Sequence, residues 1–322
     1  MPRPDEFSLI AKYFAPLASG ASGAYGLGDD AASYTPTVGH ALVLTVDAIV
    51  EGVHFLPTDP AEDVARKLLR VNLSDLAAKG ATPRGYLLTT AWTAATPEDW
   101  IASFARGLGA DQSLFGLSLW GGDTVSTPGP LSFTLTAIGE VKHGGMLRRT
   151  GALAGDDIWV TGTIGDGALG LLVALGKLDP SPDLLARYRV PEPRVTFGQR
   201  LAGLAHASLD VSDGLMADLT HLCEESGVGA RIDASALPLS SAAQACLSHM
   251  PELIETVMTG GDDYELLFAA SPDVASAIDS AARQSNTRTT RIGKLVPKAE
   301  GINAFDAGGV ALSFKQTGFR HV

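Results

Sequence analysis

Residues 71–78 read Val-Asn-Leu-Ser-Asp-Leu-Ala-Ala and end a helix that the sequence predicts for residues 59–78. The helix starts with Asp-Pro, where the aspartate is a typical N-cap and the proline fits the first helical position. It stands between two predicted strands, residues 41–46 and 86–93, which are rich in apolar and β-branched residues. Because strands and helices mix here without the regular pacing of a doubly wound sheet, the sequence predicts a mixed α/β fold of the α+β type.

The same patterns continue along the chain and divide it into two domains. A turn-rich, basic connector at residues 144–151 carries Arg148 and Arg149, so the predicted domains are residues 1–150 and 151–322. Further helices are predicted at residues 5–15, 96–115, 166–175, 193–206, 215–226 and 271–282. Further strands are predicted at residues 117–120, 131–141, 157–161, 230–232, 264–268, 289–293 and 311–314.

Length, charge and cysteine content exclude several classes of protein. A chain of 322 residues can form two domains with substantial cores, and Cys223 and Cys246 fit neither a zinc site nor a disulfide framework. The formal net charge of −12 opposes attraction to nucleic acid. No stretch reaches the ~18 uncharged apolar residues of a membrane span, and Met1–Glu6 lacks the pattern of a secretory leader. We therefore expect a cytoplasmic protein with no membrane partner.

Familiar nucleotide-binding loops are missing or unsupported. Residues 165–170, Gly-Asp-Gly-Ala-Leu-Gly, match the GxGxxG pattern after a predicted strand and before a predicted helix. The rest of a βαβ unit does not follow at the required distance, so a tight strand-to-helix turn is the better interpretation. The sequence contains neither GxxxxGK[ST] nor the catalytic-loop and DFG motifs of protein kinases. A phosphate site in this chain needs another arrangement.

Aspartates supply such an arrangement, in five segments that place Asp close to Gly, Ser or Thr. Aspartate is a hard oxygen ligand that suits Mg²⁺, and adjacent glycines let the backbone approach a phosphate closely. Gathering so many carboxylates without cations would be costly, because like charges raise each other's pKa values. The set therefore indicates a site for several metal ions and a phosphate substrate. The segments are Gly28-Asp29-Asp30-Ala31, Thr45-Val46-Asp47, Asn72-Leu73-Ser74-Asp75, Gly121-Gly122-Asp123-Thr124 and Asp210-Val211-Ser212-Asp213-Gly214.

Each segment taken alone has an ordinary explanation, because Asp, Gly and Ser are also the preferred residues of turns and N-caps. A sixth segment, residues 260–268, leads from a glycine turn into an apolar strand. It is either a plain turn or a means of placing Glu265 at a substrate pocket. His54 is equally ambiguous, since an isolated histidine is more often structural than a contact. Only the combination of segments favours a functional site.

Taken together, these segments resemble the thiamine-monophosphate kinase family, whose members use ATP to make thiamine diphosphate. The resemblance runs along nearly the whole chain, and so many motifs in one order are specific. Besides the aspartate segments, it includes Glu6–Phe14, Val50–Phe55, Val71–Ala78, Leu147–Ala152, Val160–Asp166 and Asp210–Leu215.

The resemblance implies a two-domain fold like that of aminoimidazole ribonucleotide synthetase. The N-terminal domain would form the sheet of a homodimer, and the C-terminal α+β domain would complete the phosphate and substrate site. The implied cofactor is Mg²⁺, as several ions, with ATP as co-substrate and thiamine monophosphate as acceptor. The implied metal ligands are Asp30, Thr45, Asp47, Asp75, Asp123, Asp210 and Asp213; the implied ATP contacts are Gly122, Asp123, Arg149 and Ser212; the implied thiamine-phosphate contacts are His54, Glu265 and Phe319.

The resemblance also implies a mechanism that depends on charge. The nucleophile would be a phosphate oxygen of thiamine monophosphate, which is already anionic, so we assign no general base and expect direct in-line transfer. Arg149 is the implied stabiliser of the transferred phosphoryl group, although Arg148 beside it is an alternative contact. Val46 stands where relatives often carry Thr, so it is left out of the metal set.

Two other functions stay open on this evidence. Ligases similar to aminoimidazole ribonucleotide synthetase share the fold and some of the aspartates, and a non-catalytic nucleotide sensor could also retain the fold. Two further relatives fit less well. Selenophosphate synthetases carry a reactive Cys or selenocysteine near the N-terminus, and the hydrogenase-maturation relative ends in Cys, whereas this chain ends Phe319-Arg320-His321-Val322.

Overall fold

The computed structural model describes residues 5–319 and divides the chain into two compact units. The first comprises Met1–Leu76 and Thr82–Gly144, and the second comprises Ala77–Ala81 and Gly145–Val322. The change of unit at Gly144 precedes the predicted boundary at residue 150, so that the Arg148-Arg149 pair falls in the second unit. Two segments considered above lie partly outside the described residues. They are the N-terminal segment, of which residues 1–4 are not described, and the C-terminal end, of which residues 320–322 are not described.

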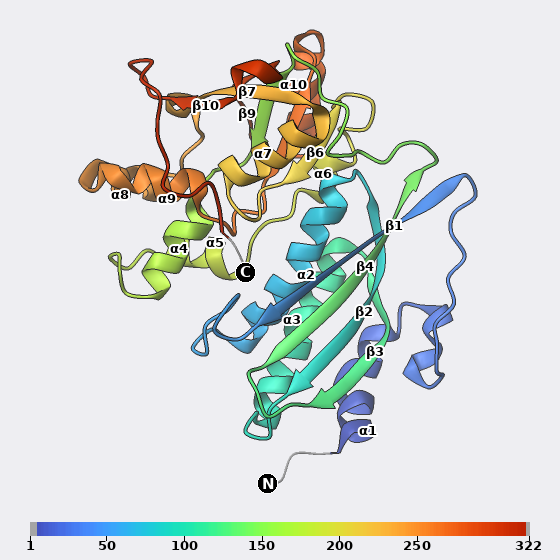
Figure 1. Ribbon diagram of the computed structural model, residues 1–322. Helices are drawn as coiled ribbons and strands as arrows, with labels where there is room; N and C mark the ends of the chain where they lie inside the picture. The colour runs from blue at the N-terminus through green and yellow to red at the C-terminus, as the bar shows by residue number, and fades with distance from the viewer. Residues whose placement is uncertain (1–4, 320–322) are drawn as a thin grey trace. The chain divides into compact units, whose positions relative to one another are not determined.

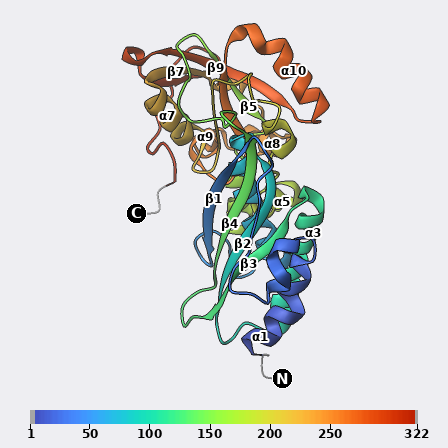
Figure 2. The ribbon, with the colours of Figure 1, turned by 90° about the vertical axis from the view of Figure 1, so that its right-hand side faces the viewer.

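The first unit is built on a four-stranded sheet in the order β1-β4-β2-β3 (Figure 2). Its strands are β1 (His40–Val50), β2 (Thr82–Trp92), β3 (Ser118–Ser126) and β4 (Ser132–Lys142). β2 and β3 are parallel and are connected through α3 (Glu98–Phe115), whereas β4 pairs antiparallel with β1 and β2. α2 (Ala61–Ala78) and α3 cover one face of the sheet (Figure 1). A cluster of aromatic rings, Trp92, Trp100, Phe104 and Phe133, fills part of that interface.

The chain before β1 is helical in short pieces that pack against β3 and α3. They are α1 (Glu6–Leu9), a π-helical turn η1 (Ile10–Phe14), and the 3₁₀ turns η2 (Ala15–Ala18) and η3 (Ser22–Leu27). The predicted helix at residues 5–15 is confirmed as helical, and Pro16 falls in the 3₁₀ turn that follows it.

Three strands of the first unit run further than predicted, and one of them is β2, which begins at Thr82 and not at residue 86. β1 continues to Val50, so Asp47 lies inside the strand and not at its end, and β3 continues through Gly121-Gly122-Asp123 to Ser126. The Gly-Gly-Asp sequence is typical of a turn, but here each residue pairs with β2, so the ladder overrides the local preference. The predicted capped start of α3 is also wrong in detail, because its N-cap is Pro97 and no side chain caps it.

The second unit contains a six-stranded sheet in the order β10-β7-β9-β5-β8-β6. β5, β6 and β8 are buried along their whole length. The strands are β5 (Asp157–Thr161), β6 (Ala207–Asp210), β7 (Val228–Asp233), β8 (Leu266–Ala270), β9 (Thr289–Pro297) and β10 (Ile302–Phe305). The helices are α4 (Asp166–Ala174), α5 (Pro182–Arg189), α6 (Val195–Gly198), α7 (Leu215–Ser226), α8 (Ser241–His249), α9 (Ile254–Thr259) and α10 (Ala275–Gln284), with 3₁₀ turns η4 (Ala234–Ala236), η5 (Pro251–Leu253), η6 (Pro272–Val274) and η7 (Lys298–Glu300).

Two predicted elements of the second unit are wrong. Residues 193–206 form only the single turn α6, which ends at Gly198, and turns follow it up to β6. Gly203, with a φ of +81°, lies in one of those turns and keeps the helix from resuming there. Residues 311–314 form no strand, since only Ala311 makes a bridge, to Phe305, and β10 takes the sheet edge instead. The other predicted helices and strands of this unit are present, and five α-helices and strands, α5, α8, α9, β6 and β10, were not predicted.

The GxGxxG segment forms the tight strand-to-helix turn that the sequence predicts. The N–H groups of Gly165 and Gly167, at the start of α4, donate hydrogen bonds of 2.7 and 3.0 Å to the buried carboxylate of Asp263. The protein's own anion therefore stands where a dinucleotide fold would hold a pyrophosphate. Among residues 5–319, no helix is both long enough and apolar enough to span a membrane.

Candidate functional site

Three of the predicted metal ligands lie together where β1 runs beside α2. Side chains alternate along β1, so Thr45 and Asp47 point to the helix-covered face, and Thr45 Oγ1 donates a hydrogen bond to Asp75 Oδ2. The N–H of Asp47 points away from β4 at this sheet edge and donates to Asn72 Oδ1 at 3.1 Å. The segment of α2 singled out in the sequence thus brings Asp75 to Thr45 and Asp47.

The loop after β1 holds His54 in a fixed orientation. The N–H of Val50 donates to His54 Nδ1 at 3.1 Å, and the buried ammonium of Lys67, on α2, donates to the carbonyl of His54 at 3.0 Å. Both the imidazole ring and the backbone of this residue are therefore held by the first unit. Lys67 was not predicted as part of a site.

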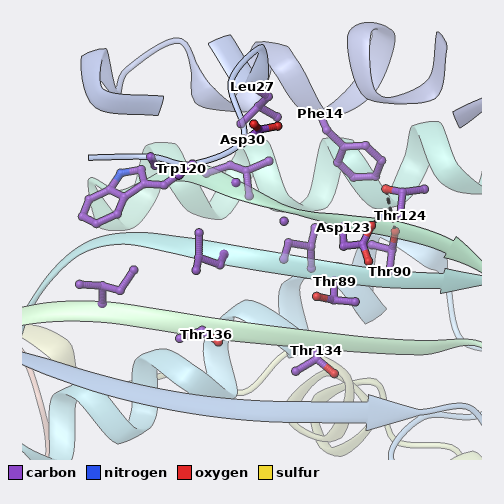
Figure 3. Close-up of a pocket in the computed structure, with 18 of the residues that line it drawn as sticks. Phe14, Leu27, Asp30, Thr89, Thr90, Trp120, Asp123, Thr124, Thr134 and Thr136 are labelled. Atoms are coloured by element: carbon purple, nitrogen blue, oxygen red, sulfur yellow. Dashed lines mark hydrogen bonds between the residues drawn. The ribbon is translucent and has the colours of Figure 1, made fainter. Parts of the chain in front are cut away.

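The other face of the same sheet carries a cavity of about 680 Å³ beneath the N-terminal segment (Figure 3). Figure 3 shows Leu27 and Asp30 on that segment, on one side of the cavity, and Asp123 on β3, on the other side. The floor carries a group of threonine hydroxyls together with Trp120, and Thr90 Oγ1 donates to Thr124 Oγ1 at 3.2 Å. The labelled threonines of the floor are Thr89, Thr90, Thr124, Thr134 and Thr136.

Gly122 is required by the pairing of β3 with β2. A Cβ atom at this position would lie 1.8 Å from the carbonyl oxygen of Leu88, so no other residue fits without moving a strand. The neighbouring Asp123 is exposed and its Oδ1 accepts the N–H of Thr124 at 2.8 Å. The Gly-Gly-Asp segment is therefore an extended strand that offers one carboxylate to the cavity.

The structure separates the predicted ligands of the first unit into two groups. Asp47 lies on β1 and Asp123 on β3, three strands apart and on opposite faces, which corresponds to roughly 14 Å along the sheet. Ligands of one Mg²⁺ ion bind at about 2.0–2.1 Å from it. Within a single copy of the chain, Asp47 and Asp123 therefore cannot bind the same ion.

A buried carboxylate, which the sequence did not reveal, binds the segment that follows Asp30 to the sheet. Glu140 on β4 accepts hydrogen bonds of 2.8 Å from Tyr34 Oη, Thr37 N and Thr37 Oγ1, and one of 2.9 Å from Arg84 Nε. The Tyr34 ring also stacks on Trp120, with 4.5 Å between the ring centroids. Burial opposes the charged form, but the hydrogen bonds outweigh it and lower the pKa of Glu140 to about 2.

Glu140→Gln is expected to remove an acid-sensitive part of the stability of the first unit. The folded pKa of about 2 lies below the ordinary 4.5, so the carboxylate contributes stability above pH 4.5 that is lost as the pH falls toward 2. Urea unfolding at pH 7 and pH 3 measures this. The wild type should lose more stability between the two pH values than Glu140→Gln, and Glu6→Gln, at an exposed acid of the same unit, should behave like the wild type. Equal losses in wild type and Glu140→Gln would contradict the assignment.

In the second unit, the loop after β6 carries Ser212 and Asp213. Its carbonyl groups accept hydrogen bonds from the N–H groups of Tyr264, Asp262 and Phe319, each between 2.8 and 3.0 Å long. Neither the Ser212 nor the Asp213 side chain makes a hydrogen bond to the described part of the chain, and both are half-buried. Asp210, at the end of β6, is buried. Phe319 is half exposed beside this loop.

Asp218 on α7 was also missed by the sequence analysis, although an acidic residue in the first turn of a predicted helix signals an interaction with that helix end. Its Oδ2 accepts the N–H groups of Ser212, Asp213 and Gly214 at 3.0, 3.0 and 3.2 Å. Burial and the neighbouring charge of Asp213 raise the pKa of Asp218 to about 7, against the opposing effect of the three N–H donors.

Glu265 is fully buried and is held by two arginines. Its Oε1 accepts from Arg187 Nη2 at 2.8 Å and from Arg194 Nη2 at 2.6 Å, while its Oε2 accepts from Arg194 Nε at 2.6 Å and from Thr161 Oγ1 at 2.7 Å. Sequence position alone gave no sign of these partners. Because the carboxylate has no exposed area, its role in the structure is to hold the two arginines inside the second unit. The predicted contact with substrate stays a prediction.

Arg148 and Arg149 are both exposed, and the structure fixes their backbone rather than their guanidinium groups. The carbonyl of Arg148 accepts the N–H of Ser208 on β6 at 2.8 Å, and the carbonyl of Arg149 accepts from Ser226 Oγ on α7 at 3.0 Å. Both side chains are therefore available to a ligand of the second unit.

The predicted metal ligands are divided between the units, five in the first and two in the second. Among residues 5–319, no group of three or more His, Cys, Asp or Glu side chains is arranged to hold a metal ion. The donors themselves are carboxylates and one hydroxyl, without sulfur or imidazole, and this is the chemistry that fits Mg²⁺. The metal site stays a prediction with suitable donors.

Comparison with known proteins gives one consistent result. Residues 28–141 match the model of the AIR synthase related protein N-terminal domain, and residues 154–303 match that of the C-terminal domain. A thiamine-monophosphate kinase of Caulobacter vibrioides is 46% identical over 309 residues, covering 95% of this chain and 88% of the relative. The crystal structure of thiamine-monophosphate kinase from Stenotrophomonas maltophilia K279a is similar with a TM-score of 0.85 at 40% identity, covering 95% of this chain and 98% of that one. AaThiL complexed with AMPPCP and TMP is similar with a TM-score of 0.78 at 29% identity, covering 98% of this chain and 97% of that one.

Proposed function

The chain belongs to the thiamine-monophosphate kinase family of AIR synthase related proteins, and we propose that it transfers the γ-phosphoryl group of ATP directly, in line, to thiamine monophosphate with the help of several Mg²⁺ ions. It has the two-domain mixed α/β fold of that family and is an enzyme, a phosphotransferase with a phosphate group as acceptor. The observation that carries the proposal is the likeness, along 98% of this chain, to a relative solved with both AMPPCP and TMP. AMPPCP is an analogue of ATP, so the two molecules correspond to the two proposed reactants.

The proposed metal ligands come from both units. In the first unit, the contact of Thr45 with Asp75 and the position of Asp47 beside them support a cluster of oxygen donors on α2 and β1. Asp30 and Asp123 at the cavity, and Asp210 with Asp213 in the second unit, complete the proposed set. When bound, Mg²⁺ neutralises phosphate charge and favours an in-line arrangement of the two anions.

The proposed ATP contacts use small or flexible groups that the fold leaves accessible. Gly122 presents backbone with no side chain, and the Ser212 hydroxyl has no partner in the described part of the chain. The planar guanidinium of Arg149 is suited to stabilise charge on the transferred phosphoryl group, and Arg148 is its alternative. We assign no general base, because the acceptor phosphate oxygen is anionic before the reaction.

Phe319→Ala is expected to raise the KM for thiamine monophosphate more than the KM for ATP. The Phe319 ring is half exposed, and the backbone N–H of Phe319 donates to the carbonyl of Asp213. This position beside the loop that carries Ser212 and Asp213 supports stacking of the ring on a flat heterocycle. Loss of one aromatic contact should cost about tenfold in KM. Steady-state kinetics with each substrate varied in turn measures the split, and Phe319→Trp should behave like the wild type. An equal rise in both KM values would remove Phe319 from the thiamine site.

We propose a homodimer formed through the sheet of the first unit. Leu42, Leu44 and Val46 expose 44%, 63% and 59% of their surfaces on the face of β1 turned away from α2, and β1 is an edge strand of the sheet. A second copy would cover this apolar face. The separation of Asp47 from Asp123 in one copy is also consistent with a site that two copies share. Sedimentation velocity of the purified protein would measure the mass.

Labelled ATP tests the proposed transfer. With [γ-³²P]ATP and thiamine monophosphate, the label should appear in thiamine diphosphate and never on the protein, because the transfer is direct. Rapid acid quenching during turnover would trap a phosphoprotein, and its detection would contradict direct transfer while leaving the reaction itself in place. The His54 and Glu265 contacts and the cytoplasmic location stay predictions.

A further inference from the structure

The loop between β6 and α7 has its N–H groups bound from within the protein. Three consecutive N–H groups, those of Ser212, Asp213 and Gly214, converge on one oxygen of Asp218, and the side chain of Asp218 is 2% exposed. Such a row of N–H groups at a helix N-terminus is the usual cradle of a phosphate or another anion. Here the protein's own carboxylate fills the cradle, so no ligand phosphate can use it.

The opposite side of the same loop is equally fixed. The carbonyl oxygens of Val211, Ser212 and Asp213 accept from Tyr264, Asp262 and Phe319, as described above. The N–H of Val211 donates to the carbonyl of Glu265 at 2.8 Å. Both the N–H and the C=O groups of the loop are therefore bound, whereas the hydroxyl of Ser212 and the carboxylate of Asp213 make no hydrogen bond to residues 5–319.

The other helix of this unit that begins at a glycine-rich turn is closed in the same way. Asp263 accepts the N–H groups of Gly165 and Gly167 at the start of α4. The two helix starts therefore share one design, in which a buried carboxylate replaces a ligand anion. They differ in what the turn carries, because only the α7 turn bears residues proposed to bind Mg²⁺ and ATP.

We propose that Asp218 is a positioning residue, which holds the Ser212–Gly214 loop in its binding conformation before Mg²⁺ and ATP arrive. Without it, three N–H groups would lose their shared acceptor oxygen, and the ligands would have to order the loop on binding. Asp218 itself does not touch the substrates. The inference rests on the proposed kinase function only where kinetics are used to test it.

The experiment compares Asp218→Ala and Asp218→Asn with Asp156→Ala. Asp156 is the matched control, because it is a buried aspartate of the same unit that accepts the N–H of Leu153 at 2.9 Å and contacts His206 Nδ1 at 2.8 Å. It lies just before β5, at the opposite end of the strands from Asp210. Hydrogen exchange of the amides of residues 212–214 is measured without any ligand. The KM values for ATP and Mg²⁺ and the kcat are measured with thiamine monophosphate, and unfolding midpoints are measured for all variants.

In Asp218→Ala, exchange at residues 212–214 should rise at least about tenfold and the KM for ATP at fixed Mg²⁺ should rise by a similar factor, because three hydrogen bonds to the loop are lost together. High concentrations of ATP and Mg²⁺ should restore most of the kcat and much of the protection. Asp218→Asn keeps one acceptor oxygen and should lie between Asp218→Ala and the wild type. Asp156→Ala should leave these amides and KM values unchanged, even if its unfolding midpoint falls.

Wild-type exchange at residues 212–214 in Asp218→Ala would overturn the inference, and so would a lower unfolding midpoint with unchanged KM values, since that describes a merely structural residue. If Asp218→Ala fails to fold, Asp218→Asn decides by the same two criteria. If the wild type forms no thiamine diphosphate, the proposed function fails, while the ligand-free exchange experiment still tests whether Asp218 holds the loop.

Discussion

Asp213→Asn is expected to lower the kcat for thiamine diphosphate formation on the order of 10²- to 10³-fold, which is the usual cost of removing one group that stabilises transition-state charge. The Asp213 carboxylate is half-buried and makes no hydrogen bond to the described part of the chain. Asparagine has the same shape but no charge, so the substitution removes a proposed Mg²⁺ ligand and little else. The free energy of unfolding should change by less than about 0.5 kcal/mol.

Asp75→Asn should abolish activity, but its effect is harder to interpret. Asp75 Oδ2 accepts a hydrogen bond from Thr45, so the substitution changes an internal contact as well as a proposed Mg²⁺ ligand. The control is Asp279→Asn, which removes an exposed carboxylate from α10 in the same unit as Asp213. Steady-state kinetics over a range of Mg²⁺ concentrations and urea unfolding are measured for all three variants. Full activity of Asp213→Asn at every Mg²⁺ concentration would remove Asp213 from the metal set.

Glu265→Ala is expected to destabilise the second unit by about 3–5 kcal/mol, the range found when one partner of a buried ion pair is removed. The substitution would leave Arg187 and Arg194, whose side chains are only 20% and 12% exposed, without their shared carboxylate. A second acidic partner, Glu192, pairs with Arg194 at 3.2 Å but is 62% exposed. Since domains are typically stable by about 5–15 kcal/mol, this loss is a large share of the total.

Urea unfolding of Glu265→Ala beside the wild type measures this loss. Glu192→Ala is the matched control, because Glu192 is 62% exposed and its pair with Arg194 should contribute about 0–1 kcal/mol. Glu265→Gln keeps the shape and tests the substrate contact, which predicts that the KM for thiamine monophosphate rises more than the KM for ATP. A stability of Glu265→Ala equal to that of the wild type would contradict the anchoring role.

Local pattern was enough to predict much of the fold. The predicted strand at residues 157–161 and the predicted helix at residues 215–226 match β5 and α7 residue for residue, because strong apolar periodicity and clear end signals coincide there. The prediction for residues 193–206 failed because the apolar spacing suits a helix, whereas the chain leaves the helix at Gly198 and continues in turns, one of which contains Gly203 with a positive φ. The Gly-Gly-Asp segment failed because pairing with β2 decides its structure, and pairing is not a local property.

The site was predictable only as far as its residues carry local motifs. Asp213 and Ser212 stand out in the sequence because they lie in a recognisable segment. The residues that hold the site in place do not stand out in this way. Glu140 meets Tyr34 across 106 positions of sequence, and Glu265 meets Arg194 across 71. No spacing rule relates residues so far apart, so the groups that hold the site had to come from the structure. The same holds for the division of the first unit's ligands between two faces of one sheet.

The most direct test of the proposed function is the formation of ADP and thiamine diphosphate from ATP and thiamine monophosphate by the purified protein, with Mg²⁺ and with Mg²⁺ removed by a chelator. The proposal predicts equal amounts of both products with Mg²⁺, and neither without it. ADP without thiamine diphosphate, or product formation that persists after Mg²⁺ is removed and no other divalent ion is present, would contradict it.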